Sequence, residues 1–214
     1  MTEDQAQDWL KANFDVSSET WDRLNTFVAF LRLEAASQNL IAASTLESVW
    51  NRHVVDSAQL IKLLSDDAPT DGSWIDLGSG AGFPGIVVAI LSDYRVTLVE
   101  YRNRRIDYLQ RAIGMLGLEK QVALAGIPLE RLETAPYSVI SARAFAPLPR
   151  LFDLASRFST DTTNWVLPKG RNAVKEWEEV QSDWGGTFRI EPSVTDADSG
   201  ILVGQLSAKR QKAR

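Results

Sequence analysis

Apolar residues in the first third of the chain recur with the period of an α-helix. They lie three and four positions apart within 6–14 and again within 21–31, which predicts two amphipathic helices. Ser44 with Glu47 has the spacing of a capping box, and the apolar residues that follow predict a third helix over 44–64. We interpret the tryptophan and phenylalanine side chains of these helices as core rather than as a surface on which bases stack.

The pattern changes at about residue 73, where short apolar runs begin to alternate with helical segments. The runs predict seven strands, at 74–77, 96–100, 122–125, 138–141, 165–168, 188–191 and 201–206. Helices are predicted between the first six of them, at about 84–92, 102–116, 128–133, 147–158 and 171–182. Such alternation is typical of an α/β fold with a parallel, doubly wound sheet. The last two strands have no helix between them, which predicts an antiparallel hairpin at one edge.

Turn-forming residues at 65–72 separate the two patterns. We therefore expect an N-terminal helical segment, 1–70, packed on a core domain of 71–208, with a short basic tail at 209–214. The apolar runs are too short to span a membrane, and the acidic N-terminus lacks the basic and apolar regions of a signal peptide. The sequence thus predicts a cytoplasmic protein. Because nothing resembles a coiled-coil seam, we expect a monomer.

The composition restricts the chemistry that the chain can perform. Its 214 residues include no cysteine and a single histidine, His53. This excludes disulfides, thiolate zinc sites, iron–sulfur clusters and a cysteine nucleophile, and it disfavours a Ser-His-Asp hydrolase. We expect no metal site.

Charge is distributed unevenly along the chain. The net charge is −5, from 23 lysine and arginine against 28 aspartate and glutamate residues. Residues 1–22 carry six acidic side chains and one basic one, so the whole excess lies there. Residues 143–175 carry six basic and two acidic side chains, a net of +4. The acidic total argues against indiscriminate binding of nucleic acid, whereas the basic stretch permits specific contacts with phosphates.

A glycine-rich turn follows the first predicted strand. Asp76, Gly78, Gly80 and Gly82 form the pattern D-x-G-x-G-x-G, after which a helix is predicted. The dinucleotide fingerprint G-x-G-x-x-G fails because its last position is Phe83, and a P-loop fails because no Gly-Lys-Ser/Thr ending follows. The pattern resembles motif I of the class I S-adenosylmethionine-dependent methyltransferases. This resemblance implies a Rossmann-like sheet of seven strands and S-adenosylmethionine as the cofactor.

The resemblance also implies which residues bind that cofactor. In this class an acidic residue at the end of the second strand binds both ribose hydroxyls, and Glu100 stands there. Asp76 would hold the turn and, through water, the ammonium group of the methionine part. Ile127, Pro128 and Leu129 are the local candidates for an apolar shelf under the adenine. The predicted cofactor-binding residues are Asp76, Gly78, Ser79, Gly80, Gly82, Phe83, Glu100, Pro128, Leu129 and Arg143.

The acceptor is constrained by what methyl transfer requires. The reaction is an in-line displacement that needs a base only if the acceptor atom carries a proton. Because the chain has no cysteine, covalent methylation of pyrimidine carbon 5 is excluded. The segment 141–145 reads Ser-Ala-Arg-Ala-Phe, unlike the Asn/Asp-Pro-Pro-aromatic segment that amino-methylation of adenine usually shows. An acceptor with a lone pair and no proton, such as guanine N7, suits a site poor in histidine, cysteine and tyrosine.

Basic residues occur where the ligand-binding edge of the sheet is predicted. Arg143 and Lys169 follow the fourth and fifth strands and should project from the carboxyl edge, where ligands bind in this architecture. A second basic group opens the helix after Glu100 and consists of Arg102, Arg104, Arg105 and Arg111. Both groups are candidates for phosphate contacts, although a solvated helix face is the commoner explanation for a single helical arginine.

Several segments together resemble one family of methyltransferases. They are Asn39-Leu40, Arg52 to Ser57, Asp76 to Gly85, Arg104-Arg105, Ser141 to Ala146 and Lys169-Gly170. Over most of its length the chain is similar to the bacterial 16S ribosomal RNA guanine-N7 methyltransferases of the RsmG type, also called glucose-inhibited division protein B. It departs from the family pattern at Tyr137-Ser138 and at Ile127 to Glu130.

This resemblance implies methyl transfer from S-adenosylmethionine to N7 of guanine 527 in the 530 loop of 16S ribosomal RNA, with the small ribosomal subunit as the partner. Arg143 and Lys169 would be the catalytic cations on the substrate side. The predicted RNA-binding residues are Asn39, Arg52, His53, Arg104, Arg105, Arg143 and Lys169.

Some alternatives stay open at this point. His53 either lines the site or is a helix-surface residue paired with Asp56 or Ser57. The chain could also methylate another RNA position, a small molecule or a protein. A third possibility is a non-catalytic module that binds the cofactor or the ribosome.

Overall fold

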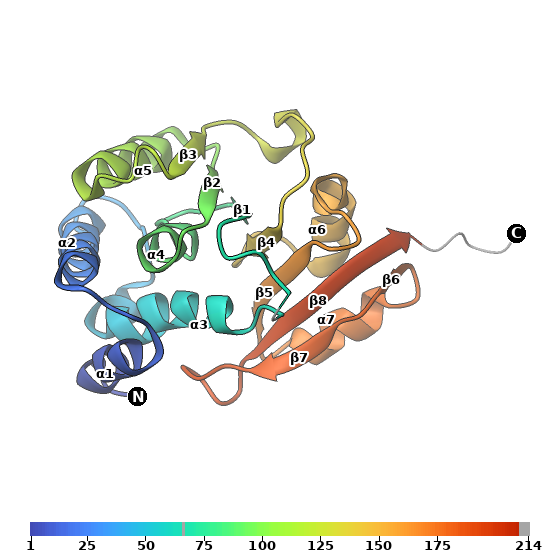
Figure 1. Ribbon diagram of the computed structural model, residues 1–214, viewed down its shortest axis with the longest axis horizontal. Coiled ribbons are helices and arrows are strands. Elements are labelled where there is room, and N and C mark those ends of the chain that lie inside the picture. The colour runs from blue at the N-terminus through green and yellow to red at the C-terminus, as the bar shows by residue number, and fades with distance from the viewer. Residues whose placement is uncertain (66, 210–214) are drawn as a thin grey trace, which may run out of the picture.

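The computed structural model describes residues 1–65 and 67–209, and a mixed sheet runs through its centre (Figure 1). The strands lie in the order β3-β2-β1-β4-β5-β8-β6, and β7 also pairs with β8. They are β1 (Ser73–Leu77), β2 (Arg95–Val99), β3 (Val122–Ala125), β4 (Val139–Ala142), β5 (Asn164–Gly170), β6 (Trp184–Gly186), β7 (Arg189–Pro192) and β8 (Gly200–Lys209). Strands β1 to β5 are parallel, and β8 is antiparallel to β5, β6 and β7.

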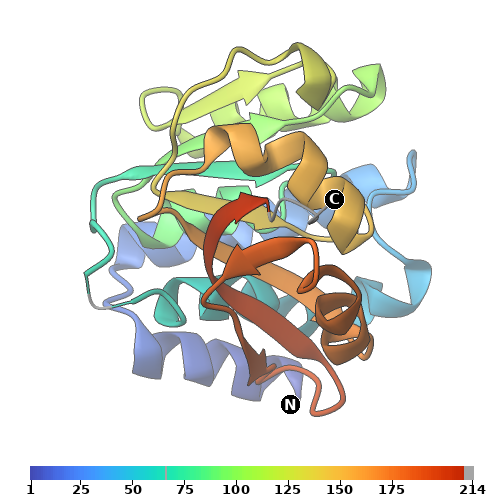
Figure 2. The same cartoon turned by 90° about the vertical axis from the view of Figure 1, so that its right-hand side faces the viewer.

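Helices cover both faces of the sheet. Figure 1 shows α2, α3 and α4 on one side and α6 and α7 on the other, and Figure 2 turns the second side toward the viewer. The α-helices are α1 (Glu3–Asn13), α2 (Ser18–Ala35), α3 (Asp56–Lys62), α4 (Gly85–Leu91), α5 (Asn103–Leu116), α6 (Leu148–Ala155) and α7 (Ala173–Val180). Shorter helical segments are η1 (Ala43–Ser48), η3 (Leu129–Arg131) and η4 (Ser156–Phe158), which are 3-10 helices, and η2 (Trp50–Val55), a π-helix.

Two hydrophobic cores lie on the two faces, because neighbouring residues of a strand point in opposite directions. Trp74 and Leu98 are buried in the core that also contains residues of α1 to α5. Ile75 and Val99, one position further along, are buried in the core that contains residues of α6 and α7. Since both faces are covered, the central strands bury apolar residues on both sides, as Trp74 and Ile75 of β1 and Leu98 and Val99 of β2 show.

The structure confirms the α/β class and the antiparallel edge that the sequence predicts. All seven predicted strands are present, and β6 is an addition, since three residues that include two glycines give no apolar pattern. The backbone N–H of Thr187 donates to the carbonyl of Gln205 at 3.0 Å, between the β6 and β7 pairings with β8. Strands β6 and β7 therefore form one interrupted edge strand, and the sheet has seven positions across.

The segment 43–62 differs from the single helix that the sequence predicts. It passes from the 3-10 helix η1 through the π-helix η2 into α3, and the capping box of Ser44 with Glu47 does not form. Instead the Glu3 carboxylate of α1 accepts hydrogen bonds from the backbone N–H groups of Trp50 and Asn51, at 3.1 and 3.0 Å. A distant carboxylate thus takes the place of the local cap at the start of the π-helix.

The N-terminal helices belong to the same core as the sheet, and their aromatic residues are buried or partly buried as interpreted from the sequence. The Trp21 ring stacks on that of Trp50 with centroids 5.1 Å apart. Among the residues that the structure describes, none of the helices is both long and apolar enough to cross a membrane. Of the predicted tail 209–214, Lys209 ends β8 and pairs with Asp153 at 2.7 Å, and 210–214 lie outside the described residues.

Candidate active site

The carboxyl ends of the parallel strands place the predicted site residues along one edge of the sheet. Strand β1 leads into the glycine loop, β2 ends just before Glu100, β4 ends just before Arg143, and Lys169 lies near the end of β5. Because β1 pairs in parallel with both β2 and β4, the glycine loop lies between Glu100 and Arg143. The strand order reverses at this point, which is where α/β sheets bind ligands.

Asp76 holds the glycine loop to its neighbours. The side chain is buried, one carboxylate oxygen accepts from the Gly85 N–H at 3.2 Å, and the other accepts from the Ser141 hydroxyl at 3.0 Å. Burial raises the pKa of Asp76 to about 6, although the hydrogen bonds from Ser141 and Gly85 oppose this. The Ser79 hydroxyl donates to the Asp76 carbonyl at 2.9 Å, so this predicted cofactor residue also serves the loop itself.

Two glycines of the loop are required by backbone conformation and by space. Gly78 and Gly82 have φ values of +71° and +88°, which side-chain-bearing residues rarely adopt. A Cβ at Gly78 would lie 2.5 Å from the Phe145 ring, and a Cβ at Gly82 would lie 2.6 Å from Ile86. Phe145, which belongs to a segment of the family resemblance but for which no role was predicted, therefore covers the loop from the side of β4.

Glu100 follows β2 directly and is a buried carboxylate. One oxygen accepts from the Gly80 N–H at 3.2 Å, and the other accepts from the backbone N–H groups of Tyr101 and Arg102 at 2.9 and 3.0 Å. The Arg102 side chain binds both oxygens, with Nε and Nη2 at 3.0 and 2.8 Å. Burial opposes ionisation, but the hydrogen bonds from Arg102 and Tyr101 outweigh it and lower the pKa of Glu100.

Tyr101, the residue after Glu100, lines a cavity of about 490 Å³ together with residues that include Pro128, Leu129 and Phe145. Its apolar residues suit a purine ring, and a carboxylate such as that of Glu100, next to Tyr101 in the chain, suits the two hydroxyls of a ribose. Ile127, the third candidate for the adenine shelf, is exposed. The residues at this end of the sheet therefore fit S-adenosylmethionine.

A second cavity, of about 430 Å³, adjoins Arg143. Its walls come from η1, η2, α3, the segment after β4, the end of β5 and the loop between β7 and β8. The residues are Thr45, Arg52, His53, Asp56, Arg143, Ala144, Pro168, Lys169, Gly170, Ser193, Thr195, Asp196, Ser199, Gly200 and Ile201. We call this cavity the acceptor pocket. It contains the two predicted catalytic residues together with Arg52 and His53.

Arg143 is held on several sides at the acceptor pocket. Its Nη1 atom lies 3.3 Å from an Asp56 carboxylate oxygen, and its Nη2 atom lies 3.1 Å from Nδ1 of His53. The guanidinium carbon lies 5.2 Å from the centroid of the Phe83 ring. Phe83, predicted to bind the cofactor, is buried and packs on His53 and Phe27, with both centroid distances 5.1 Å.

Lys169 and Arg52 also have acidic partners. Lys169 Nζ lies 3.0 Å from the Glu176 carboxylate and 3.2 Å from the carbonyl of Ala146, and the side chain is 8% exposed. Arg52 pairs with Asp196 at 3.2 Å and is 40% exposed. The side chain of Arg52 is therefore more accessible to a large ligand than that of Lys169.

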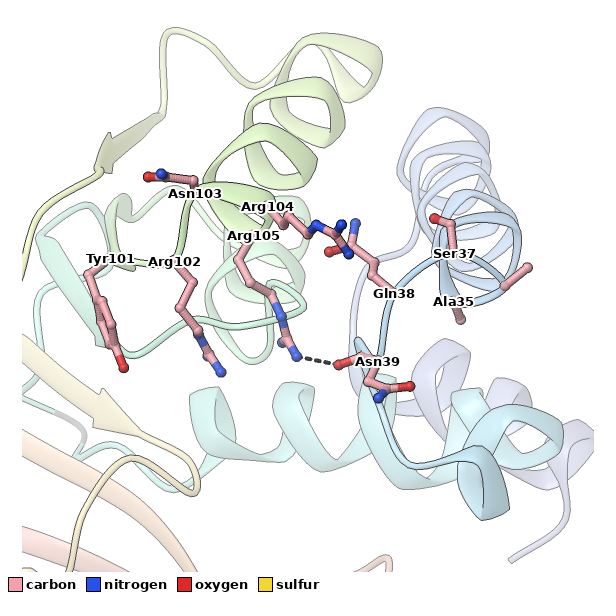
Figure 3. A pocket seen from close by; sticks show the side chains of 10 residues that line it. Ala35, Ser37, Gln38, Asn39, Tyr101, Arg102, Asn103, Arg104 and Arg105 are labelled. Carbon is pink, nitrogen blue, oxygen red and sulfur yellow. Dashed lines mark hydrogen bonds between the residues drawn. The ribbon is translucent and has the colours of Figure 1, made fainter.

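The remaining predicted RNA contacts lie in a separate, open hollow between the C-terminal end of α2 and the start of α5 (Figure 3). Arg105 donates to the backbone carbonyls of Asn39 and Leu40, which ties α5 to the segment after α2. Arg104 is exposed and also lines the hollow. Arg111, the last of this basic group, pairs with Glu34 at 2.7 Å.

The structure thus assembles the two ends of the site and also adds partners that the sequence did not reveal. His53 is buried, which rules out the helix-surface interpretation, and it contacts Arg143 rather than Asp56 or Ser57 through its ring. The sequence around Phe145 and Asp196 does not predict their contacts at the site, because a lone aromatic and a loop aspartate fit many roles. In the described part of the chain, no group of three or more histidine, cysteine, aspartate or glutamate residues could hold a metal ion.

Comparison with known proteins identifies the family of this chain. The family model described as rRNA small subunit methyltransferase G matches residues 20–197. The protein named ribosomal RNA small subunit methyltransferase G from Sphingopyxis alaskensis is 54% identical over 93% of this chain and 84% of its own length. The protein of that name from Rhizorhabdus wittichii is 51% identical over 100% of this chain and 99% of its own.

Solved structures show the fold. A SAM-dependent methyltransferase from Aquifex aeolicus aligns with a TM-score of 0.57 at 12% identity, covering 74% of this chain and 92% of the other. A tRNA methyltransferase from Bacillus subtilis aligns with a TM-score of 0.54 at 12% identity, covering 71% and 65%. The match to the family model, the identity with its members and the fold place this chain in the rRNA small subunit methyltransferase G family, as an enzyme that uses S-adenosylmethionine.

Proposed function

We propose that this enzyme methylates N7 of guanine 527 in the 530 loop of 16S ribosomal RNA. The observation that carries the proposal is the state of the acceptor pocket beside the glycine loop. The pocket contains His53, but both ring nitrogens of His53 are already bonded within the protein, one to Thr45 and one to Arg143. A pocket whose imidazole is occupied in this way suits an acceptor atom that has a lone pair and no proton to lose.

The residues act by binding and orientation. When bound, S-adenosylmethionine supplies a methyl group on a positively charged sulfur, and the guanine N7 lone pair is the nucleophile. Arg143 and Arg52 provide donors at the pocket, and Asp56 and Asp196 provide acceptors. A guanine presents both acceptors, at N7 and O6, and donors, at its amino edge, so a mixed wall of this kind can orient it. Placing N7 in line with the methyl group is then the main catalytic contribution.

The RNA backbone requires further contacts outside the pocket. We assign them to Arg52 at the pocket rim and to Arg104, Arg105 and Asn39 at the hollow between α2 and α5. Arg104 is exposed and can pair with a phosphate, whereas Arg105 and Asn39 shape the hollow through their own hydrogen bond. Lys169 acts at the acceptor pocket, where its ammonium contacts the segment after β4. In this proposal the enzyme is cytoplasmic and acts as a monomer. Sedimentation of the purified protein tests its oligomeric state.

Identification of the methylated atom tests the proposal. The enzyme is incubated with methyl-labelled S-adenosylmethionine and small subunits from cells that lack the modification, and the RNA is then treated with borohydride and aniline. N7-methylguanine carries a fixed positive charge that makes its ring reducible and the chain cleavable at that nucleotide. We expect incorporation of label together with a cut at guanine 527.

The other outcomes contradict the proposal in distinguishable ways. Label without a cut would mean that another atom receives the methyl group, and a cut elsewhere would mean another nucleotide. Transfer to a small metabolite but not to RNA would exclude an RNA substrate, and cofactor binding without any transfer would indicate a non-catalytic module. Small subunits that already carry the modification serve as the matched control and should take up no label.

A further inference from the structure

His53 lies at the centre of a chain of hydrogen bonds that ends at Arg143. The residue belongs to the π-helix η2, which is followed at once by α3 and its first residue, Asp56. Nδ1 of His53 faces Nη2 of Arg143 at 3.1 Å, and Nε2 faces the Thr45 hydroxyl at 2.8 Å. The imidazole therefore bridges η1 and the segment after β4.

The partners on the two sides select one protonation state of the ring. Arginine has only donors, so Nδ1 must accept from Arg143 and carries no proton. The Thr45 hydroxyl donates to the carbonyl of Ala42 at 2.8 Å, so its oxygen accepts from Nε2, which must carry the proton. Two independent neighbours thus require the same form, a neutral imidazole protonated on Nε2.

We infer that His53 is a positioning residue whose neutral, Nε2-protonated ring fixes the Arg143 guanidinium at the acceptor pocket, rather than a contact to RNA. The inference rests on the role of Arg143 in the proposed function. Asp56, the Arg52 carbonyl and His53 together engage Nη1 and Nη2 of Arg143, and Phe83 lies beneath the plane of the guanidinium. Within the described residues, these contacts use three of its five N–H donors and leave the Nε–H and one Nη2–H for a ligand.

The surroundings keep the ring neutral at working pH. His53 is 8% exposed, and the charged groups around it are Arg143, Arg52 and, through Arg143, Asp56. Burial, together with the positive charges of Arg143 and Arg52, lowers the pKa of His53 to about 3. A protonated ring would turn the acceptor at Nδ1 into a donor that faces another donor.

Two substitutions test the two hydrogen bonds of the ring separately, because each can replace one of its nitrogens. In His53→Asn the side-chain oxygen can take the place of Nδ1 and accept from Arg143. In His53→Gln the side-chain NH₂ can take the place of Nε2 and donate to Thr45, but no acceptor faces Arg143. We expect His53→Gln and His53→Ala to lose about 10- to 100-fold in kcat, because one charge-assisted hydrogen bond is removed, with the Kd of S-adenosylmethionine unchanged. His53→Asn should recover at least half of that loss on a logarithmic scale.

The controls distinguish positioning from loss of folding. Glu47→Gln changes an exposed side chain in η1 and should leave kcat within about twofold of the parent enzyme. Thermal unfolding is measured for every variant, and the order of kcat, with His53→Asn above His53→Gln, is compared among variants of matched stability. Equal activity of the asparagine and glutamine variants, or a glutamine variant as active as the parent, would overturn the inference.

Nitrogen-15 NMR measures the protonation state of the His53 ring directly. Because His53 is the single histidine of the chain, histidine labelled with nitrogen-15 gives the signals of one ring. We expect a protonated Nε2 and an unprotonated Nδ1 at pH 7, and an upward shift of the pKa in Arg143→Gln. A proton on Nδ1, or a charged ring at pH 7, would overturn the inference. This readout needs no RNA, so it remains valid even if the methylated atom is not guanine N7.

Discussion

The glycine loop with Glu100 and the acceptor pocket lie on the same edge of the sheet, yet the chain builds them in different ways. The loop and Glu100 fall within residues 76–100, and the carboxylate–guanidinium pair beside them joins Glu100 to Arg102, two residues away. The corresponding pair of the acceptor pocket joins Asp56 to Arg143, 87 residues apart. The cofactor side therefore depends mostly on local sequence, whereas the acceptor side exists only when the N-terminal helices pack against the sheet.

Removal of the Arg143 guanidinium is expected to have the largest effect, and only on the acceptor side. We expect Arg143→Ala to lower kcat about 100- to 1,000-fold, because the acceptor is no longer oriented, while the Kd of S-adenosylmethionine stays within about threefold. Lys169→Ala should act in the same direction but less strongly. Methyl transfer to small subunits and calorimetric titration with cofactor provide the two measurements.

Arg95→Ala is the matched control for this prediction, because Arg95 is an exposed arginine at the opposite, amino end of β2. It should leave both quantities unchanged. If Arg143→Ala weakened cofactor binding as much as turnover, the two sides of the site would not be separable, and Arg143 would belong to the cofactor side.

The two sides should also respond oppositely to acid. Between about pH 4 and pH 6 the folded chain holds a proton on Asp76 that the unfolded chain lacks, so the Asp76 contribution to the free energy of unfolding falls as pH rises. Between about pH 3 and pH 6.5 the unfolded chain holds a proton on His53 that the folded chain lacks, so the His53 contribution rises with pH. The expected change for Asp76 is about 3 kcal/mol, from a shift of about two pKa units.

Denaturant unfolding at pH 4, 5 and 6 checks these signs. Relative to the parent chain, Asp76→Asn should gain stability as pH rises, and His53→Asn should gain stability as pH falls. The parent chain shows the sum of both groups and is the reference in each comparison. Parallel curves for the parent chain and either variant would mean that the substituted group does not titrate in that range.

Substitution of Glu100 should have the opposite pattern to that of Arg143, with an effect on cofactor binding rather than on kcat. We expect Glu100→Gln to raise the Kd of S-adenosylmethionine about 10- to 100-fold, since the carboxylate would lose a charge-assisted pair of hydrogen bonds to the ribose. At saturating cofactor, kcat should change less than about threefold. A fall in kcat with the Kd preserved would assign Glu100 to the acceptor side and contradict the role that motif I implies.

The same contrast explains what the sequence could predict. The glycine loop and the strands were predictable because their signals, glycine spacing and apolar runs, lie within a few consecutive residues. The π-helix that carries His53 was not, since its start is capped by Glu3, some 47 residues away in the chain. Likewise, no local pattern indicates that Phe145 covers Gly78 or that Asp56 binds Arg143. Their side chains are ordinary for their positions, and only tertiary packing brings them together.

The smallest effect on cofactor binding is expected from substitution of Arg102, whose side chain competes with the ribose hydroxyls for Glu100. Arg102 Nε and Nη2 bind both oxygens of Glu100, the same oxygens to which we expect the ribose hydroxyls to donate. Arg102 is 50% exposed, so its guanidinium remains hydrated when it leaves the buried Glu100 carboxylate. We therefore expect Arg102→Ala to tighten S-adenosylmethionine binding about two- to fivefold in a calorimetric titration. Arg102→Lys keeps the charge but not the paired donors, so its Kd for S-adenosylmethionine should lie between those of the parent enzyme and Arg102→Ala. Weaker binding by Arg102→Ala would instead show that this arginine orients Glu100 for the cofactor, as His53 and Asp56 orient Arg143, and the two sides would then share one principle of construction.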